Sequence, residues 1–268
     1  MTNLHRELAP ISDKAWAQIE EEASRTLKRH LAARRVVDVP DPRGLELSAV
    51  GTGHLRQIPP PGDGIQAALR GAQALVELRV PFELARQQID DVERGATDSD
   101  WSPVKDAART IAFAEDRAVF DGYASAGIQG IREGSSNPRV ALPATVSGYV
   151  GAVAQAMSLL RLAGVNGPYA LILGAEAYTA ASGGSDEGDP VFHHLERVVD
   201  GKIVWAPAIE GGCVLTTRGG DFELAVGQDL SIGYQRHSTD VVELYLQETL
   251  TFRLLTTEAA VVLTPAGK

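Results

Sequence analysis

The sequence predicts an α+β fold, and three observations carry this prediction. Apolar residues recur every three or four positions in three long segments, which is typical of helices with one buried face. The final third instead alternates apolar and polar residues, the period of half-buried strands. A stretch rich in proline and glycine separates the first helical segment from the second. The 268 residues suffice for one elaborated domain or two modest ones, each with its own core.

The first helix is predicted to begin near Asp13. Ser12 is a suitable N-cap, and Asp13 suits the positive end of the helix dipole. Apolar side chains then follow one face: Trp16, Ile19, Ala23, Leu27 and Leu31. Basic residues gather at the end of this segment, where they favour the negative end of the dipole.

Between residues 40 and 71 the helical period disappears. About thirty residues without it are long for a loop inside a compact domain, so we expect a two-stranded extended arm or a functional excursion that projects. Segment 77–84 then alternates apolar and polar residues and contains Pro81, which predicts a strand at the edge of a sheet.

Two further helices follow. Ser102 is predicted to cap a helix that has Pro103 in its first turn and continues to about residue 123. A third helix is expected over 145–163, followed by a short buried strand at 169–173.

The last third combines one polar loop with strands. Segment 182–190 is too rich in glycine, serine and acidic residues for anything but a loop. We interpret residues 218–221 as the turn of a hairpin between strands 214–217 and 222–226. Segment 242–254 reads as one very long strand.

Charge and composition exclude several classes of protein. With 44% hydrophobic and 22% charged residues, the chain is neither a disordered tail protein nor a coiled-coil rod. The 25 basic and 35 acidic side chains give a formal charge of −10, so we expect no nucleic-acid and no membrane partner. The longest nearly apolar stretch, 149–160, is too short to span a bilayer, and charges interrupt the opening segment where a secretory signal would lie. These features favour the cytoplasm.

No catalytic or metal-binding motif fits its required context. The adjacent His193 and His194 lack the spacing of zinc sites, and the segment around Ser185 misses the nucleophile pattern of α/β-hydrolases. Cys213, at the head of an apolar strand, is interpreted as a buried inert thiol. We therefore predict no catalytic residue, no metal site and no cofactor.

Several segments, in the expected order over nearly the whole chain, resemble the family 1 encapsulin shell proteins, also known as linocin-like bacteriocins. They are LHRELAP at 4–10, RRVVDV at 34–39, IDDVERG at 89–95, GPY at 167–169, RGGDF at 218–222, GQDLSIGY at 227–234 and ETLTF at 248–252. The resemblance implies a fold like that of tailed-phage major capsid proteins. Its parts would be an N-terminal helix and inner-face segment (1–44), an extended arm (45–75), a peripheral domain with a long spine helix (76–139 and 226–268) and an axial domain (140–225).

The resemblance also implies a function. Roughly sixty or more copies would build a closed icosahedral shell in the cytoplasm. The shell would enclose a cargo enzyme that carries a short C-terminal targeting peptide and resembles a dye-decolourising peroxidase or a ferritin-like iron-oxidising protein. Its role would lie in oxidative stress or iron storage, and the shell itself would not catalyse a reaction.

The resemblance implies a binding site for the cargo peptide on the inner surface. The positions carried over are Leu27, Leu31, Arg34, Asp38, Asp229, Leu230 and Ile232. The aliphatic side chains would form an apolar pocket, while Arg34 and Asp38 would fix the polarity and register of the peptide. The alternative is that the leucines belong to the core and that Arg34 pairs within the fold.

The resemblance further implies a loop around a five-fold pore. Its residues would be Gly183, Gly184, Ser185, Asp186, Glu187, Gly188 and Asp189. Five copies of the carboxylates would favour cations such as ferrous iron, and the glycines would let the loop move; the alternative is a solvated turn. Some encapsulins bind a flavin near a tryptophan that follows the arm, but segment 83–89 has no tryptophan, so we expect no flavin here.

Two hypotheses of other classes remain open. A prophage-type capsid subunit that packages DNA is disfavoured by the helical N-terminus and by the lack of a strongly basic inner-facing run. A soluble hydrolase is disfavoured because no nucleophile stands in a recognisable context.

Overall fold

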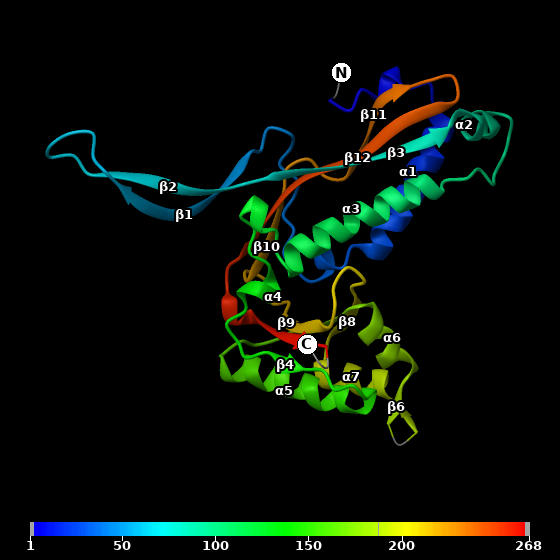
Figure 1. Cartoon of the computed structure of the whole chain (residues 1–268). Coiled ribbons are helices and arrows are strands. Elements are labelled where there is room, and N and C mark those ends of the chain that lie inside the picture. Colours follow the sequence, from blue (N-terminus) through cyan, green and yellow to red (C-terminus); the bar gives the residue numbers. More distant parts are fainter. Residues whose placement is uncertain (1–2, 187, 266–268) are drawn as a thin grey trace.

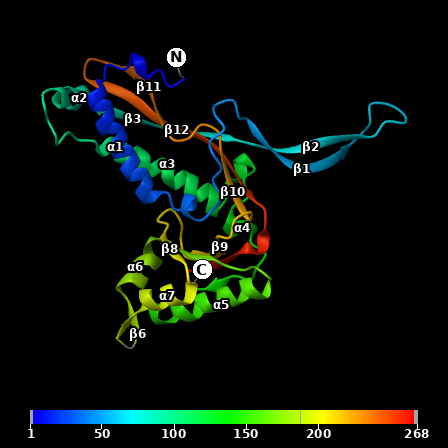
Figure 2. The same ribbon diagram turned by 180° about the vertical axis from the view of Figure 1, so that it is seen from behind.

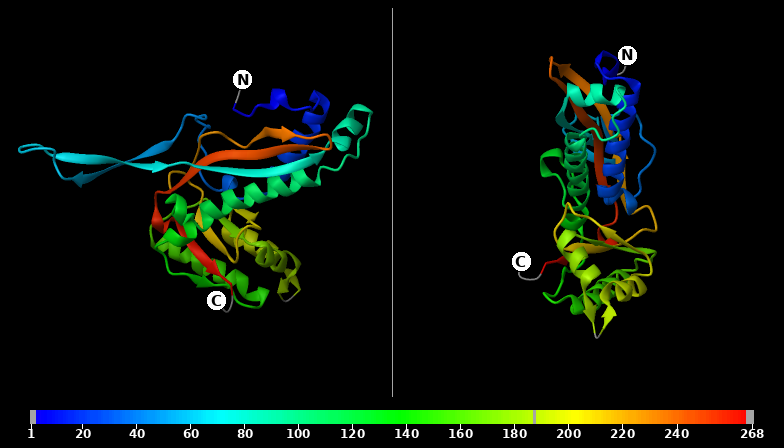
Figure 3. Two further views of the ribbon diagram at one scale, coloured as in Figure 1. Left: turned by 45° about the horizontal axis from the view of Figure 1, so that its top comes forward. Right: turned by 90° about the vertical axis from the view of Figure 1, so that its right-hand side faces the viewer.

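The computed structural model describes residues 3–186 and 188–265, which form two lobes and a projecting arm (Figure 1). The first lobe is a four-stranded sheet covered by three helices, and the second is a five-stranded sheet with three helices on one face. Seen edge-on in the right-hand view of Figure 3, the lobes lie one above the other in a narrow body. Among the described residues, no helix is long and apolar enough to cross a bilayer.

The sheet of the first lobe has four antiparallel strands. They are β3 (Val76–Ala85), β10 (Phe222–Val226), β11 (Ser231–His237) and β12 (Val241–Leu254). The very long strand predicted at 242–254 is confirmed as β12, which pairs with β3 on one side and with β10 and β11 on the other. β3 lies at an edge, as Pro81 predicts, because proline has no amide hydrogen for a second neighbour. Phe82 and Leu84 are buried while Pro81 is exposed, as the alternation requires.

Three helices cover this sheet. They are α1 (Asp13–His30), α2 (Arg86–Glu93) and α3 (Ser102–Phe120). The hydroxyl of Ser12 accepts the amide hydrogen of Ala15, which confirms it as the N-cap of α1. Ser102 does not cap α3 but is its first residue, because the carboxylate of Asp100 accepts the amide hydrogen of Ser102 at 2.9 Å. Apolar faces of α1 and α3 pack together with β3 and β12 in one core.

Strands β1 (Ala49–Ile58) and β2 (Ala67–Ala74) form the arm, a two-stranded antiparallel hairpin. Figure 2 shows it extending away from both lobes. Val50 is buried, and every other position of these two strands, all within the described part of the chain, is half-buried or exposed. The arm therefore has almost no core within this chain.

The second lobe has a five-stranded sheet with helices on one face. The strands, in sheet order, are β4 (Val140–Ala141), β13 (Ala260–Thr264), β9 (Gly212–Thr216), β5 (Tyr169–Leu173) and β8 (Lys202–Trp205). The helices are α5 (Tyr149–Leu162), α6 (Ala175–Gly183) and α7 (Val191–Val199). Alternate residues of β5 face opposite ways: Leu171 packs against the helices, whereas Ile172 packs into the core that joins the two lobes. The predicted buried strand at 169–173 is thus confirmed.

Short elements complete the chain. They are α4 (Ile131–Gly134), β6 (Ser185–Asp186), β7 (Asp189–Pro190) and 3-10 turns at Arg6–Leu8, Ala33–Arg35, Ala124–Ala126, Val146–Gly148 and Thr257–Ala259. The helix predicted over 145–163 therefore divides into a 3-10 turn followed by α5. The helix predicted to reach residue 123 ends at Phe120, shortly before Gly122, which has a φ of 94°.

The predicted hairpin around residues 218–221 is wrong. Strands β9 and β10 belong to different sheets, and the turn between them crosses from the second lobe to the first. The carbonyl oxygen of Asp221 accepts amide hydrogens from Leu255 and Thr256, which lie on the return crossing. Turn residues report a change of direction but not which strands pair, and here each strand has a partner distant in the sequence.

The placement of residues 226–268 in a single domain is also wrong at its C-terminal end. β13 pairs antiparallel with β9 and parallel with β4, so it belongs to the sheet of the second lobe. Four of its five residues are buried, which fits a strand between two neighbours.

Candidate cargo site and pore loop

Arg34 lies at the centre of the predicted cargo site and binds three carboxylates. Its Nε donates to both oxygens of Glu115 at 2.9 Å, and its Nη2 donates to Glu115 Oε2 at 2.6 Å. Nη1 donates to Asp229 at 2.8 Å, and Nη2 also reaches Glu248 at 3.2 Å. Because Glu115 is on α3 and Glu248 on β12, the guanidinium joins a helix, a sheet and the segment before β11.

Burial makes this cluster electrostatically unusual. The side chains of Glu115 and Glu248 are fully buried, whereas that of Asp229 is 44% exposed. Burial, and then the neighbouring Glu115, raises the pKa of Glu248 well above its ordinary value. Burial alone would lower the pKa of Arg34, but hydrogen bonds and attraction to Glu115 and Asp229 outweigh burial and raise it. The cluster therefore holds a charged arginine beside a Glu248 carboxyl whose raised pKa favours its neutral form.

Asp116 fixes the segment that follows α1. Its carboxylate accepts the amide hydrogen of Ala32 at 3.0 and 3.1 Å and that of Ala33 at 2.9 Å. These amides begin a 3-10 turn and would otherwise lack partners. Burial raises the pKa of Asp116 to about 7, although the two amides act in the opposite direction.

Three of the four apolar residues of the predicted site, Leu27, Leu230 and Ile232, belong to one core, and the four differ in accessibility. Leu31 is 8% and Ile232 5% exposed, so both are structural residues. Leu27 and Leu230 are half-buried and pack against the same core, Leu27 from α1 and Leu230 from the residue before β11. These two side chains therefore offer accessible apolar surface, and Leu230 directly follows Asp229 in the chain.

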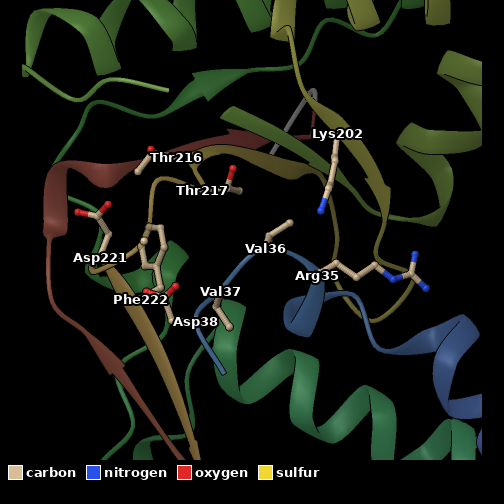
Figure 4. A pocket seen from close by; sticks show the side chains of 10 residues that line it. Arg35, Val36, Val37, Asp38, Lys202, Thr216, Thr217, Asp221 and Phe222 are labelled. Carbon is tan, nitrogen blue, oxygen red and sulfur yellow. The ribbon is translucent and has the colours of Figure 1, made fainter. Parts of the chain in front are cut away.

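Asp38 lies in a different part of the fold. Its Oδ2 accepts the amide hydrogen of Gly220 at 2.6 Å, and its backbone pairs with β10. Figure 4 shows Asp38 beside Phe222 and Asp221 at a small cavity of about 170 Å³ between the lobes. Gly220 has a φ of 82°, which lets its amide point at the carboxylate. Asp38 thus orders the crossing turn, and among the described residues no hydrogen bond joins it to the other six of the predicted site.

The predicted pore loop is a small hairpin at the outer end of the second lobe (Figure 1). α6 continues to Gly183, and strands β6 and β7 pair Ser185 with Pro190 and Asp186 with Asp189. The side chain of Asp189 is 78% exposed and lies 3.7 Å from Nε2 of His194. Glu187 lies outside the described residues, and within the described part of the chain no group of acidic, histidine or cysteine side chains could hold a metal ion.

Cys213 is fully buried, and burial raises the pKa of its thiol to about 12. The predicted burial of this thiol is therefore confirmed, and its raised pKa disfavours the thiolate form at neutral pH.

Sequence reasoning missed two of the three carboxylates that bind Arg34, Glu115 and Glu248. It also missed Asp116, which holds the segment before Arg34. A signal for the first existed, because Glu115 occupies a position that the helical period of α3 reserves for buried side chains. A carboxylate on a buried face requires a cation, and Arg34 supplies it.

Comparisons with known proteins agree with this architecture. Residues 1–251 match a family described as "Encapsulating protein for peroxidase". The type 1 encapsulin shell protein of Rhodococcus erythropolis is 60% identical over 261 residues, which cover 97% of this chain and 99% of that protein. Among solved structures, a virus-like particle from Pyrococcus furiosus superposes with a TM-score of 0.67 at 17% identity, over 92% of this chain and 98% of the other. The capsid of Myoviridae phage XM1 gives a TM-score of 0.54 at 10% identity, over 88% and 92%.

The fold and its arm are those of capsid proteins, which confirms the predicted fold class. The chain belongs to the family of type 1 encapsulin shell proteins. Members of this family are structural proteins, so the chain is a shell component and not an enzyme.

Proposed function

We propose that this chain builds a closed icosahedral shell in the cytoplasm that encloses a cargo enzyme bearing a C-terminal targeting peptide. The observation that carries the proposal is the projecting arm on a capsid fold. Leu55 is 65% exposed, Ile65 50% and Leu69 47%, although all three are large apolar side chains. Neighbouring copies in a shell would cover them, as apolar surface of this kind requires. The family description, which mentions a peroxidase, supports a peroxidase-like cargo; a ferritin-like cargo is the second candidate.

The targeting peptide is proposed to bind beside Asp229. Leu27 and Leu230 offer half-exposed aliphatic surface, and Asp229 keeps 44% of its side chain accessible while it pairs with Arg34. An extended peptide with aliphatic residues could place them on this surface and its polar groups at Asp229. Leu31, Ile232 and Asp38 would support the site from beneath or from the lobe junction without touching the peptide.

The test is co-purification of a fluorescent protein that carries the C-terminal peptide of a candidate cargo. Leu230→Asp should abolish capture while particles still form. Leu162→Asp is the matched control, because Leu162 is 83% exposed on α5 of the second lobe. Equal capture by both variants would refute the peptide site, and absence of particles from the unaltered chain would refute the shell.

The same particles distinguish the prophage hypothesis. We expect no nuclease-protected DNA inside them, since the chain carries a formal charge of −10. Recovery of protected DNA would instead support a genome-packaging capsid.

The hairpin at residues 183–189 is proposed to line a five-fold pore. Asp186 and Asp189 on five copies would attract cations and repel anions. Replacing both with asparagine should slow ferrous-ion entry, measured as iron oxidation by an enclosed ferritin-like protein. The matched control replaces Asp90 and Asp98, two exposed aspartates of the first lobe. Unchanged iron entry in the hairpin variant would show that ions cross elsewhere.

We also propose that the chain divides into an inner-face segment (1–44), an arm (45–75), a peripheral domain and an axial domain. In this division β13 belongs to the axial domain, because it pairs with β9 and β4.

A further inference from the structure

A second pocket, unrelated to the cargo site, lies between the two lobes. It has a volume of about 420 Å³ and is formed by α1, by the first half of α3 and by Trp205 at the end of β8. Both lobes contribute to it, and pockets at such boundaries are common places for small ligands.

The pocket carries positive charge in an acidic chain. Arg25 and Arg29 of α1 and Lys105 and Arg109 of α3 line it, and Glu22 is the one acidic side chain among its described lining residues. Glu22 is engaged by Arg25 and lies 4.0 Å from Lys105. Formal charges on the lining residues therefore sum to about +3, against −10 for the whole chain.

The position of these charges does not follow from helix stability. Basic residues at the end of α1 favour its dipole, but Lys105 and Arg109 lie in the first two turns of α3. The positive end of a helix dipole disfavours cations there. Arg109 pairs with Asp106 at 2.8 Å, whereas Arg29 makes no ion pair with any described residue. The arrangement thus keeps cations available at the pocket.

An aromatic wall stands beside the charges. The His30 ring lies 5.7 Å from the Trp205 ring and 5.7 Å from the Phe113 ring. Nδ1 of His30 donates to the carbonyl oxygen of Thr26 at 2.8 Å, which fixes the orientation of the imidazole. Trp205 remains half-buried, so part of its indole is open to a ligand.

We propose that this pocket binds a small phosphorylated aromatic compound of the nucleotide class. The phosphates would accept hydrogen bonds from Arg29 and Lys105, and the ring would stack on Trp205. The volume suits a mononucleotide and excludes a folded nucleic acid. This inference does not depend on the cargo site or on the pore.

The first experiment compares three probes by calorimetry on assembled shells at low salt. ADP should bind at least about tenfold more tightly than pyrophosphate, which lacks a ring, and than adenosine, which lacks phosphate. Equal affinity for ADP and pyrophosphate would refute the stacking part of the proposal, and no binding of ADP would refute all of it.

Variants then locate the site. Arg29→Ala and Lys105→Ala should each weaken ADP binding about tenfold, and Trp205→Ala should do the same while Trp205→Phe retains most of the affinity. Arg139→Ala is the matched control, because Arg139 is an exposed arginine far from this pocket. If Trp205→Ala fails to form particles, Arg29→Ala and Lys105→Ala still test whether ADP binds in this pocket. Unchanged ADP binding in both would overturn the assignment.

Discussion

The first lobe and the arm differ in how much apolar surface they bury within this chain. In the first lobe, α1, α3, β3 and β12 bury one another's apolar faces. The arm buries little more than Val50, although both of its strands are longer than β10 and β11 of the sheet. A lone two-stranded hairpin is marginally stable in water. Contacts within this chain therefore stabilise the lobe, whereas the arm depends on contacts with neighbouring copies in the proposed assembly.

Acidic substitutions in the arm test this difference most directly. Leu55 and Leu69 lie on opposite faces of the hairpin, because Leu55 pairs with Arg70 and Leu69 with Arg56. Replacing both leucines with aspartate should abolish particles, since each would bury an unpaired charge against a neighbouring copy. Light scattering should then show a small species whose far-ultraviolet circular dichroism is nearly unchanged.

Leu162→Asp serves as the control, because Leu162 is more exposed than either leucine of the arm. Particles that survive the double change would mean that the arm is not an assembly contact. Loss of helical signal would mean that the arm supports the lobe.

A change in the Arg34 cluster should instead lower the stability of the folded chain itself. Arg34→Leu leaves Glu115 and Glu248 buried without their cation, so we expect a loss of about 3–5 kcal/mol in the free energy of unfolding. Glu248→Gln should cost less, because burial raises the pKa of Glu248 and so favours a neutral side chain at this position. Thermal unfolding of both variants measures the difference. Equal losses would show that Glu248 is ionised in the folded protein.

The same contrast explains what could be predicted from the sequence. Helix α1 and strand β12 follow from local periods, because each buries one face against a neighbour within the same lobe. The partners of the strands beside residues 218–221 do not follow from local patterns, since only the tertiary structure decides that β9 and β10 belong to separate sheets.

The residues of the candidate site likewise differ in how well the sequence predicts their positions. Arg34 and Asp229 do meet, at 2.8 Å, as the resemblance implies. Asp38 is only four residues after Arg34, yet its carboxylate holds the turn at Gly220, because the chain runs from the 3-10 turn Ala33–Arg35 to β10 and pairs with it. Glu248 is absent from the predicted site because a single acidic residue in a strand carries no local sign of the arginine that it meets.

The smallest effect concerns the titration of Asp116. Burial raises its pKa from 3.8 to about 7, so between these values the folded chain holds a proton that the unfolded chain has released. The unfolding free energy contributed by this group is therefore complete below about pH 4 and declines as pH rises through 7, by at most about 1.4 kcal/mol per pH unit.

Asp116→Asn removes this titration but keeps an oxygen for the amides of Ala32 and Ala33, so its melting temperature should fall less steeply between pH 4 and 7 than that of the unaltered protein. Glu248 titrates in both proteins and cancels in the difference. Asp98→Asn, at an exposed position, should leave the profile unchanged. Parallel profiles for Asp116→Asn and the unaltered protein would mean that Asp116 is ionised throughout. The two amides of the 3-10 turn would then outweigh the cost of burial, and the joint between α1 and α3 would owe its stability to a charge.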